Sequence, residues 1–179
     1  MPIDRMIRAL KLEPSVYDEL EMDRSATTDA FMVVAAVAFI SALGGFIGGI
    51  RNPGAAFVGL IVAVIAAVIG WIVWSYITYW IGTSLLNGTA TPGELLRTLG
   101  FAYTANALGF FSFIPFFGGI IAFIGSIWAL VAGIVAVRQA LDFDTGKALI
   151  TVVIGWVVML IIGLVVALFG ASLAFIFGR

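Results

Sequence analysis

The feature that most constrains this chain is a series of long apolar runs, separated by short turns that carry most of the charge. Hydrophobic residues make up 63% of the sequence and charged residues only 11%, whereas an average soluble protein carries about 25% charged residues. Lipid must therefore surround most of the chain, and only helices or closed barrels satisfy the backbone there. The runs lack the alternating pattern of barrel strands. The sequence predicts an all-α, polytopic membrane protein.

Turn signals between the runs predict five transmembrane helices, each near or above the ~20 residues needed to cross a bilayer. We expect them at about residues 30–50, 55–82, 92–113, 117–138 and 147–170. The third start is the clearest, because residues 91–94 (TPGE) have capping-box spacing with proline at the first helical position. We therefore expect a cytoplasmic segment, 1–29, followed by a five-helix transmembrane domain, 30–179.

The N-terminal segment predicts a short cytoplasmic amphipathic helix. Ile3, Met6, Ile7 and Leu10 recur at the spacing of one helical face, and the basic residues fall away from that face. Such a helix lies in the headgroup region of an anionic leaflet, or packs on the cytoplasmic end of its own protein. Both alternatives stay open.

The distribution of basic residues predicts the orientation of the chain. With five spans, one side holds Arg5, Arg8, Lys11, Arg24, Arg97, Arg138 and Lys147. Only Arg51 and Arg179 lie on the other side. Because basic residues favour the cytoplasmic side, we expect a cytoplasmic N-terminus and an outer C-terminus in a cell (plasma or inner) membrane.

Small residues predict where helices pack most closely. The first span ends in two overlapping GxxxG pairs, which are Gly44/Gly48 and Gly45/Gly49. The fourth span carries a row of small residues, namely Gly125, Ala129 and Gly133. Such positions let helix backbones approach each other. We favour packing within one chain over oligomerisation for the glycine pairs, because small-residue contacts also hold single bundles together.

Residues 93–156 resemble the Yip domain family, the Ypt/Rab-GTPase-interacting polytopic membrane proteins. The resemblance lies in GELLRTLGFAYTANAL, IPFFGG, AVRQALDFDTGKAL and IGW, and extends loosely over about 27–170. It implies five spans with a cytoplasmic N-terminus. Eukaryotic members act in traffic between the endoplasmic reticulum and the Golgi, bind prenylated small GTPases and influence membrane shape.

This chain departs from the family pattern at Asn106, and it also lacks a feature of the eukaryotic members. It shows no long cytoplasmic N-terminal region, so it resembles a prokaryotic-type member, and binding of Rab GTPases is not carried over. Asn106 also stands where similar sequences are expected to have proline.

The side chains available to this protein argue against an enzyme. The chain has neither cysteine nor histidine, which removes thiolate catalysis and the favoured proton shuttle. No ionisable group lies at the centre of an expected span, and the intramembrane serines lack a base to activate them. We expect no catalytic residue, no cofactor and no metal. The absence of a basic cluster also argues against a nucleic-acid partner.

Two polar side chains within the third span are candidates for a functional contact. Asn106 carries the intramembrane amide, and Tyr103 lies on the same stripe of the expected helix. Asn106 either contacts a substrate or lipid, or makes an interhelical hydrogen bond. We favour the hydrogen bond, because polar side chains commonly hold membrane helices together.

Four charges at the base of the third and fourth spans form the second candidate site. Because these spans are antiparallel, Glu94, Arg97, Arg138 and Asp142 are expected at one cytoplasmic face. Arg97–Asp142 and Glu94–Arg138 are candidate ion pairs between helices. The alternative is a pair of local ion pairs, Glu94–Arg97 and Arg138–Asp142. A site where partners are recognised is expected here.

These features together predict a non-enzymatic scaffold or an accessory subunit of a membrane assembly. Its expected partners are membrane lipids and either other membrane proteins or further copies of itself. One alternative is a transporter or channel for a small or lipidic solute, with Asn106 and Tyr103 lining the path. Another is a lipid-organising protein that acts through its N-terminal helix.

Overall fold

The computed structural model describes the backbone of residues 2–177, and side chains up to residue 165 and at residues 167 and 168. This part of the chain is all-α. Its helices are α1 (Pro2–Leu10), α2 (Pro14–Met22), α3 (Ala26–Gly48), α4 (Pro53–Leu86), α5 (Pro92–Ala102), the 3₁₀ helix η1 (Tyr103–Phe113), α6 (Phe117–Ala140) and α7 (Thr145–Phe177). Four of these are long and apolar enough to cross a membrane, namely α3, α4, α6 and residues 145–165 of α7.

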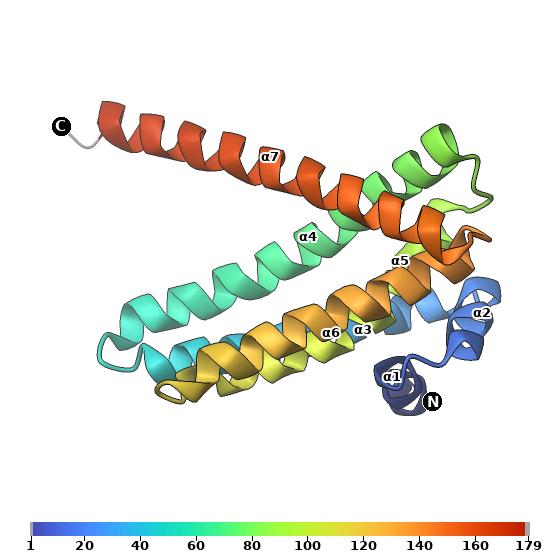
Figure 1. Ribbon diagram of the computed structural model, residues 1–179. Coiled ribbons are helices and arrows are strands. Elements are labelled where there is room, and N and C mark those ends of the chain that lie inside the picture. Colours follow the sequence, from blue (N-terminus) through green and yellow to red (C-terminus); the bar gives the residue numbers. More distant parts are fainter. Residues whose placement is uncertain (1, 178–179) are drawn as a thin grey trace.

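A central bundle consists of α3, α6 and the continuous element α5–η1, which lies between them (Figure 1). Local sequence signals set the ends of these helices. Asn52 precedes α4 and accepts a hydrogen bond from the Ala55 amide at 3.4 Å, and Pro53 fills the first helical position. Asn87 ends α4 in the left-handed region, with φ 57°, a conformation that asparagine tolerates at helix ends. The observed bounds therefore lie within a few residues of those expected for this span.

The third expected span is divided into two kinds of helix. Residues 92–102 are α-helical, but residues 103–113 form a 3₁₀ helix, which is unusually long for that type. Two side chains at the junction bond to carbonyls three residues earlier: Thr104 Oγ1 donates to Phe101 O at 2.7 Å, and Asn106 Nδ2 donates to Tyr103 O at 3.1 Å. Such side-chain bonds compete with regular α-helical geometry. Capping and hydropathy predicted one uniform helix, and they carry no signal for this change.

α4 and α7 form two arms beside the bundle. They cross near the end of the bundle where α2 lies, and α7 then runs away from the other helices (Figure 1). Trp71 ties α4 to the bundle, since its Nε1 donates to Leu96 O of α5 at 3.1 Å. The most apolar 18-residue stretch of α4 has only 6% of its residues buried, compared with 33% in α3. Most of α4 therefore faces outward.

α1 and α2 lie at one end of the bundle (Figure 1). Val16, Tyr17 and Leu20 of α2 are completely buried, so α2 is an integral part of the folded core. α1 is joined to α2 through its basic residues: Arg8 pairs with Glu13 at 3.0 Å and Glu19 at 2.7 Å. The N-terminal segment 1–29, expected from the sequence to be cytoplasmic, therefore packs against the helices that follow it.

Candidate functional site

The start of α5 is held by a complete capping box. The Glu94 amide donates to Thr91 Oγ1 at 3.4 Å, and the Thr91 amide donates to Glu94 Oε2 at 2.8 Å. The Glu94 side chain is therefore bonded to the helix start, which is the role that the spacing of residues 91–94 predicted.

Arg97 lies one turn further along α5 and is only 5% exposed. Its Nε donates to Leu20 O at 2.7 Å, and its Nη2 donates to Glu21 O. Both carbonyls belong to the last turn of α2, where a helix has no backbone partners of its own. Nη1 makes a longer contact of 3.5 Å with Thr27 Oγ1 at the start of α3. One guanidinium thus joins three helices.

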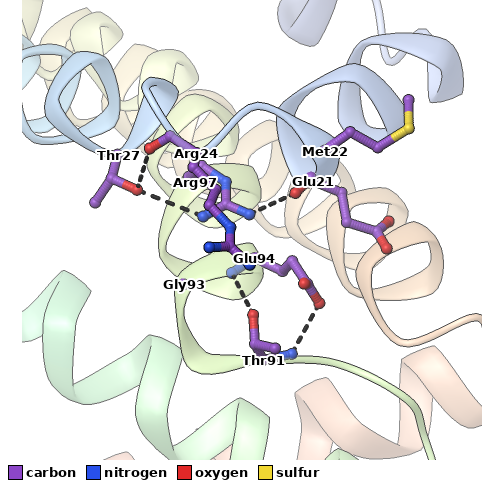
Figure 2. Close-up of a pocket in the computed structure, with 8 residues that line it drawn as sticks. All are labelled: Glu21, Met22, Arg24, Thr27, Thr91, Gly93, Glu94 and Arg97. Carbon is purple, nitrogen blue, oxygen red and sulfur yellow. Dashed lines mark hydrogen bonds between the residues drawn. The ribbon is translucent and has the colours of Figure 1, made fainter.

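A cavity of about 570 Å³ opens beside this guanidinium (Figure 2). It lies where the end of α2, the loop after it and the starts of α3 and α5 converge. The lining residues are Glu21, Met22, Arg24, Thr27, Thr91, Gly93, Glu94 and Arg97. Two of them, Glu94 and Arg97, were candidates from the sequence. Arg24 and Glu21 were not, because their proximity depends on how α2 packs against α5.

The carboxyl of Glu21 is half-buried and lies near other acidic side chains, which changes its pKa. Burial raises the pKa of Glu21 to about 7, and the negative charges of Glu94, Asp142 and Asp18 act in the same direction. A carboxyl that loses hydration while facing other acids favours its neutral form. Near neutral pH, the neutral form of the Glu21 carboxyl is therefore populated beside the charged form.

The other two charged candidates lie apart from Arg97. Arg138 Nε donates to the side chain of its neighbour Gln139 at 3.0 Å, and Gln139 in turn donates to Asp18 of α2 at 2.6 Å. Asp142 Oδ2 accepts a hydrogen bond from Thr89 Oγ1 at 2.8 Å. These contacts join the turn after α6 to the loop after α4, and α6 to α2.

The ion pairs considered from the sequence are not formed. In the described part of the chain, ion pairs join only α1 to α2 and the short segments that flank α2. Arg97–Asp142 and Glu94–Arg138 are absent from this set, as are the local pairs Glu94–Arg97 and Arg138–Asp142. For Arg97 the physical reason is its contact with α2, because the last carbonyls of α2 accept the hydrogen bonds that a carboxylate would otherwise accept.

A second, apolar cavity of about 690 Å³ lies between the two arms and the bundle. Tyr103 and Asn106 of η1 both line it, together with Trp74 of α4 and Trp156 of α7. The Asn106 amide donates to a carbonyl of its own helix, not to another helix, so the interhelical donor bond that we favoured is absent. The same cavity is lined by Ala129 and Gly133.

The candidate packing residues divide according to the face on which they lie. A Cβ added to Gly44 would collide with the Phe110 carbonyl, and one added to Gly125 would lie 2.8 Å from Leu108 Cβ. Gly48 lies near Phe113 of the same 3₁₀ helix. Gly45, by contrast, has nothing within 4 Å of an added Cβ, and Gly49 faces Ala56 in the following helix. Among the candidate packing glycines, Gly44 therefore lies at a close approach of α3 to η1, and Gly125 at a close approach of α6 to η1.

Comparison with known proteins identifies the family of the chain. Neither a curated protein nor a solved structure matches it. The family model described as the Yip1 domain matches residues 12–168, which is most of the chain and includes every residue of the cavity beside Arg97. This match confirms the resemblance that residues 93–156 predicted. The chain is a member of the Yip1 domain family of membrane proteins.

Proposed function

We propose that α5 and η1 together form a fifth membrane crossing, in addition to α3, α4, α6 and α7. Eleven α-helical residues and eleven 3₁₀ residues extend roughly 16 Å and 22 Å at their usual rises. Their sum exceeds the ~30 Å hydrocarbon core. Lipid tolerates irregular helices only where protein covers them, and η1 is covered by Gly44 of α3 and Gly125 of α6. Residues 30–179 then form the transmembrane domain.

The proposed orientation places α1, α2 and the start of α5 on the cytoplasmic side of a plasma or inner membrane. The seven basic residues on this side outnumber the two on the other, and basic residues favour the cytoplasmic side. The chain has no cysteine, so single cysteines introduced at Asp144 and Asn52 provide a clean test. We expect an impermeant maleimide to label Asn52→Cys in intact cells and Asp144→Cys only after lysis; the reverse pattern rejects this orientation.

We propose that the protein is a non-enzymatic scaffold or accessory subunit that binds other membrane helices through its arms. The observation that carries this proposal is the exposed face of α4. Gly59 of α4 and Gly163 of α7 are exposed and have nothing within 4 Å of an added Cβ. In membranes, small residues are enriched where helices pack, and these two glycines have no helix of their own chain against them.

Gentle detergent extraction followed by identification of co-purifying membrane proteins tests this role. We expect Gly59→Leu and Gly163→Leu to release a stable partner or to dissociate a homo-oligomer, because the larger side chain keeps a second backbone away. Val58→Leu is the matched control, since it enlarges the adjacent exposed side chain. If the glycine variants and Val58→Leu retain the same partners and the same oligomeric size, the arms are not the binding surface.

We also propose that α1 lies along the membrane interface. It runs across the bundle and not along it (Figure 1), and Ile3 and Ile7 are 70% and 48% exposed. The opposite side of α1 is held by protein, since Ala9 is buried and Leu10 O accepts a hydrogen bond from Trp128 Nε1 at 2.8 Å. One face of α1 then lies in the headgroup region and the other packs on the protein, so both alternatives left open by the sequence apply to the same helix.

Cysteine accessibility in proteoliposomes distinguishes insertion from simple exposure to water. We expect Ile3→Cys to react slowly with a water-soluble maleimide in vesicles and rapidly in the unfolded protein. Asp4→Cys is the control, because Asp4 is an exposed polar neighbour. Equal reaction rates at both positions in vesicles exclude insertion of this face.

The apolar cavity supports a second candidate function, passage or binding of a lipidic solute. Apolar cavities of this size, with a few polar groups, are typical of ligand sites, and Tyr103 and Asn106 supply such groups here. Solute flux through reconstituted protein, lost in Asn106→Leu while the oligomeric state is unchanged, supports this alternative. A protein that stays inactive in flux but binds a membrane partner supports the scaffold.

A further inference from the structure

The most unusual charge in the described structure is the Arg97 guanidinium. It is almost completely buried, yet its hydrogen bonds go to backbone carbonyls and to Thr27 Oγ1, all of them uncharged groups. A buried charge without an opposite charge is costly. The ion pairs of the described chain do not include Arg97.

A second guanidinium, that of Arg24, lines the same cavity from the loop between α2 and α3 (Figure 2). It too is outside the ion pairs of the described residues. Two cations of like sign repel each other in a partly buried space, because water screens them less there. Placing both beside one cavity is favourable when an anion occupies the space between them.

Nearby acidic residues neutralise this pair only in part: the negative charges of Glu94 and Asp23 favour the charged form of Arg97, but neither forms an ion pair with it. Glu94 is bonded to the Thr91 amide in the capping box, and it is not within ion-pairing distance of either arginine. Glu21 is partly uncharged near neutral pH, as its raised pKa indicates. The cavity also lies at the N-terminal end of α5, where the helix dipole favours negative charge.

We propose that this cavity binds a phosphate group, with the Arg24 and Arg97 guanidiniums as its donors. Arginine matches phosphate geometrically and makes strong, charge-assisted hydrogen bonds to it. With the orientation proposed above, the site lies at the cytoplasmic end of the bundle, where α3 and α5 begin, which is the level of the phospholipid headgroups. The volume of about 570 Å³ exceeds that of a single phosphate. Free phosphate is the other source of the same chemistry.

The test compares ligands that differ in the phosphate alone. The full chain is purified in neutral detergent, and its thermal midpoint is followed by tryptophan fluorescence while phosphatidic acid or diacylglycerol is added. We expect phosphatidic acid, but not diacylglycerol, to raise the midpoint in a saturable way. Inorganic phosphate is compared with chloride at equal ionic strength. A rise with inorganic phosphate assigns the site to free phosphate as well, and a rise with the lipid alone assigns it to a headgroup.

Arg24→Gln is the decisive variant, because the Arg24 side chain is exposed and makes none of the hydrogen bonds that hold α2. In this variant we expect the ligand concentration that gives half-maximal stabilisation to rise about tenfold, which corresponds to the loss of one charge-assisted contact. Arg51→Gln removes the same charge beyond the other end of α3, and it should leave the phosphate-dependent stabilisation unchanged. Glu94→Gln, which keeps the capping geometry, should strengthen it.

Three results overturn the proposal. The first is equal stabilisation by phosphatidic acid and diacylglycerol together with equal stabilisation by phosphate and chloride. The second is an unchanged response in Arg24→Gln, and the third is an equal loss in Arg24→Gln and Arg51→Gln. Arg97→Gln serves only as a supporting variant, since it also removes the bonds to α2.

Discussion

The Arg97 guanidinium donates a hydrogen bond to the Leu20 carbonyl at 2.7 Å, across 77 residues of sequence. This bond joins the first turns of α5 to the last turn of α2, and the neighbouring Glu21 carbonyl accepts a second bond from the same group. One buried side chain therefore joins α2 to the bundle at two points, in addition to the Gln139–Asp18 hydrogen bond to α2 and the Trp128–Leu10 hydrogen bond to α1.

Arg97→Gln should lower the free energy of unfolding by about 1.5–3 kcal/mol, because it removes charge-assisted bonds and leaves buried carbonyls unpaired. Arg97→Lys should recover only part of this loss, since one ammonium does not reproduce the planar fork of a guanidinium. Thermal midpoints of the detergent-purified proteins measure both effects. Arg51→Gln, at an exposed arginine, is the control, and a midpoint shared by Arg97→Gln and Arg51→Gln contradicts the role given to Arg97.

Gly44 and Gly45 are adjacent in sequence but should respond oppositely to alanine. Gly44→Ala places a methyl group against the Phe110 carbonyl and should cost about 1–3 kcal/mol, as overpacking does. Gly45→Ala meets open space and should be neutral or stabilising by up to about 1 kcal/mol, because alanine loses less entropy in a helix. The comparison uses thermal midpoints and size-exclusion profiles. Equal effects at both positions count against close packing of α3 on η1.

Glu21→Gln should remove a pH dependence of stability. The carboxyl has a pKa of about 7 when folded and an ordinary value of 4.5, so between these pH values the folded protein holds the proton more tightly. The contribution of the protonated carboxyl to the stability of the fold is therefore fully present below about pH 4.5 and is lost as the pH rises to about 7. Relative to wild type, Glu21→Gln should raise the thermal midpoint at pH 8 but not at pH 4.5.

Asp4→Asn, which removes an exposed carboxylate of α1, controls for the change in net charge in that experiment. If the difference in thermal midpoint between wild type and Glu21→Gln is the same at both pH values, Glu21 titrates normally when folded and the prediction is wrong.

Asn106→Leu should preserve the fold, with a change of less than about 1 kcal/mol, since it removes one local hydrogen bond and adds apolar surface to an apolar cavity. Asn106→Asp should instead destabilise by about 2.5 kcal/mol or more if the carboxyl stays charged within the membrane. Thermal midpoints and expression levels measure the difference. Ser126→Ala, which removes another bond to a carbonyl three residues earlier, is the matched control. Unfolding of Asn106→Leu indicates an essential polar contact at this position.

Much of the architecture was predictable because its signals are local. The capping box of residues 91–94, the prolines that start α4 and α5 and the uninterrupted apolar runs act within a few residues of one another. They predicted an all-α membrane protein and placed most helix ends within a few residues. The motifs within 93–156 predicted the family, and the Yip1 domain match confirms it.

The candidate site was only partly predictable. Glu94 and Arg97 were singled out because they are charges at the start of an apolar helix, and both line the cavity (Figure 2). Arg24 and Glu21 lie far from them in sequence, in a segment whose own pattern shows only helix and loop. No local signal connects the two segments.

By itself, the sequence determined what must lie in lipid, where helices begin and which family the chain belongs to, because hydropathy and capping depend on neighbours along the chain. Only the tertiary structure decided that Arg97 bonds α2 and not a carboxylate, that residues 103–113 tighten into a 3₁₀ helix, and that the two arms diverge. These outcomes depend on which surfaces meet in space. A buried guanidinium bonds whichever acceptors the packing brings within reach, and here these acceptors are the last carbonyls of α2.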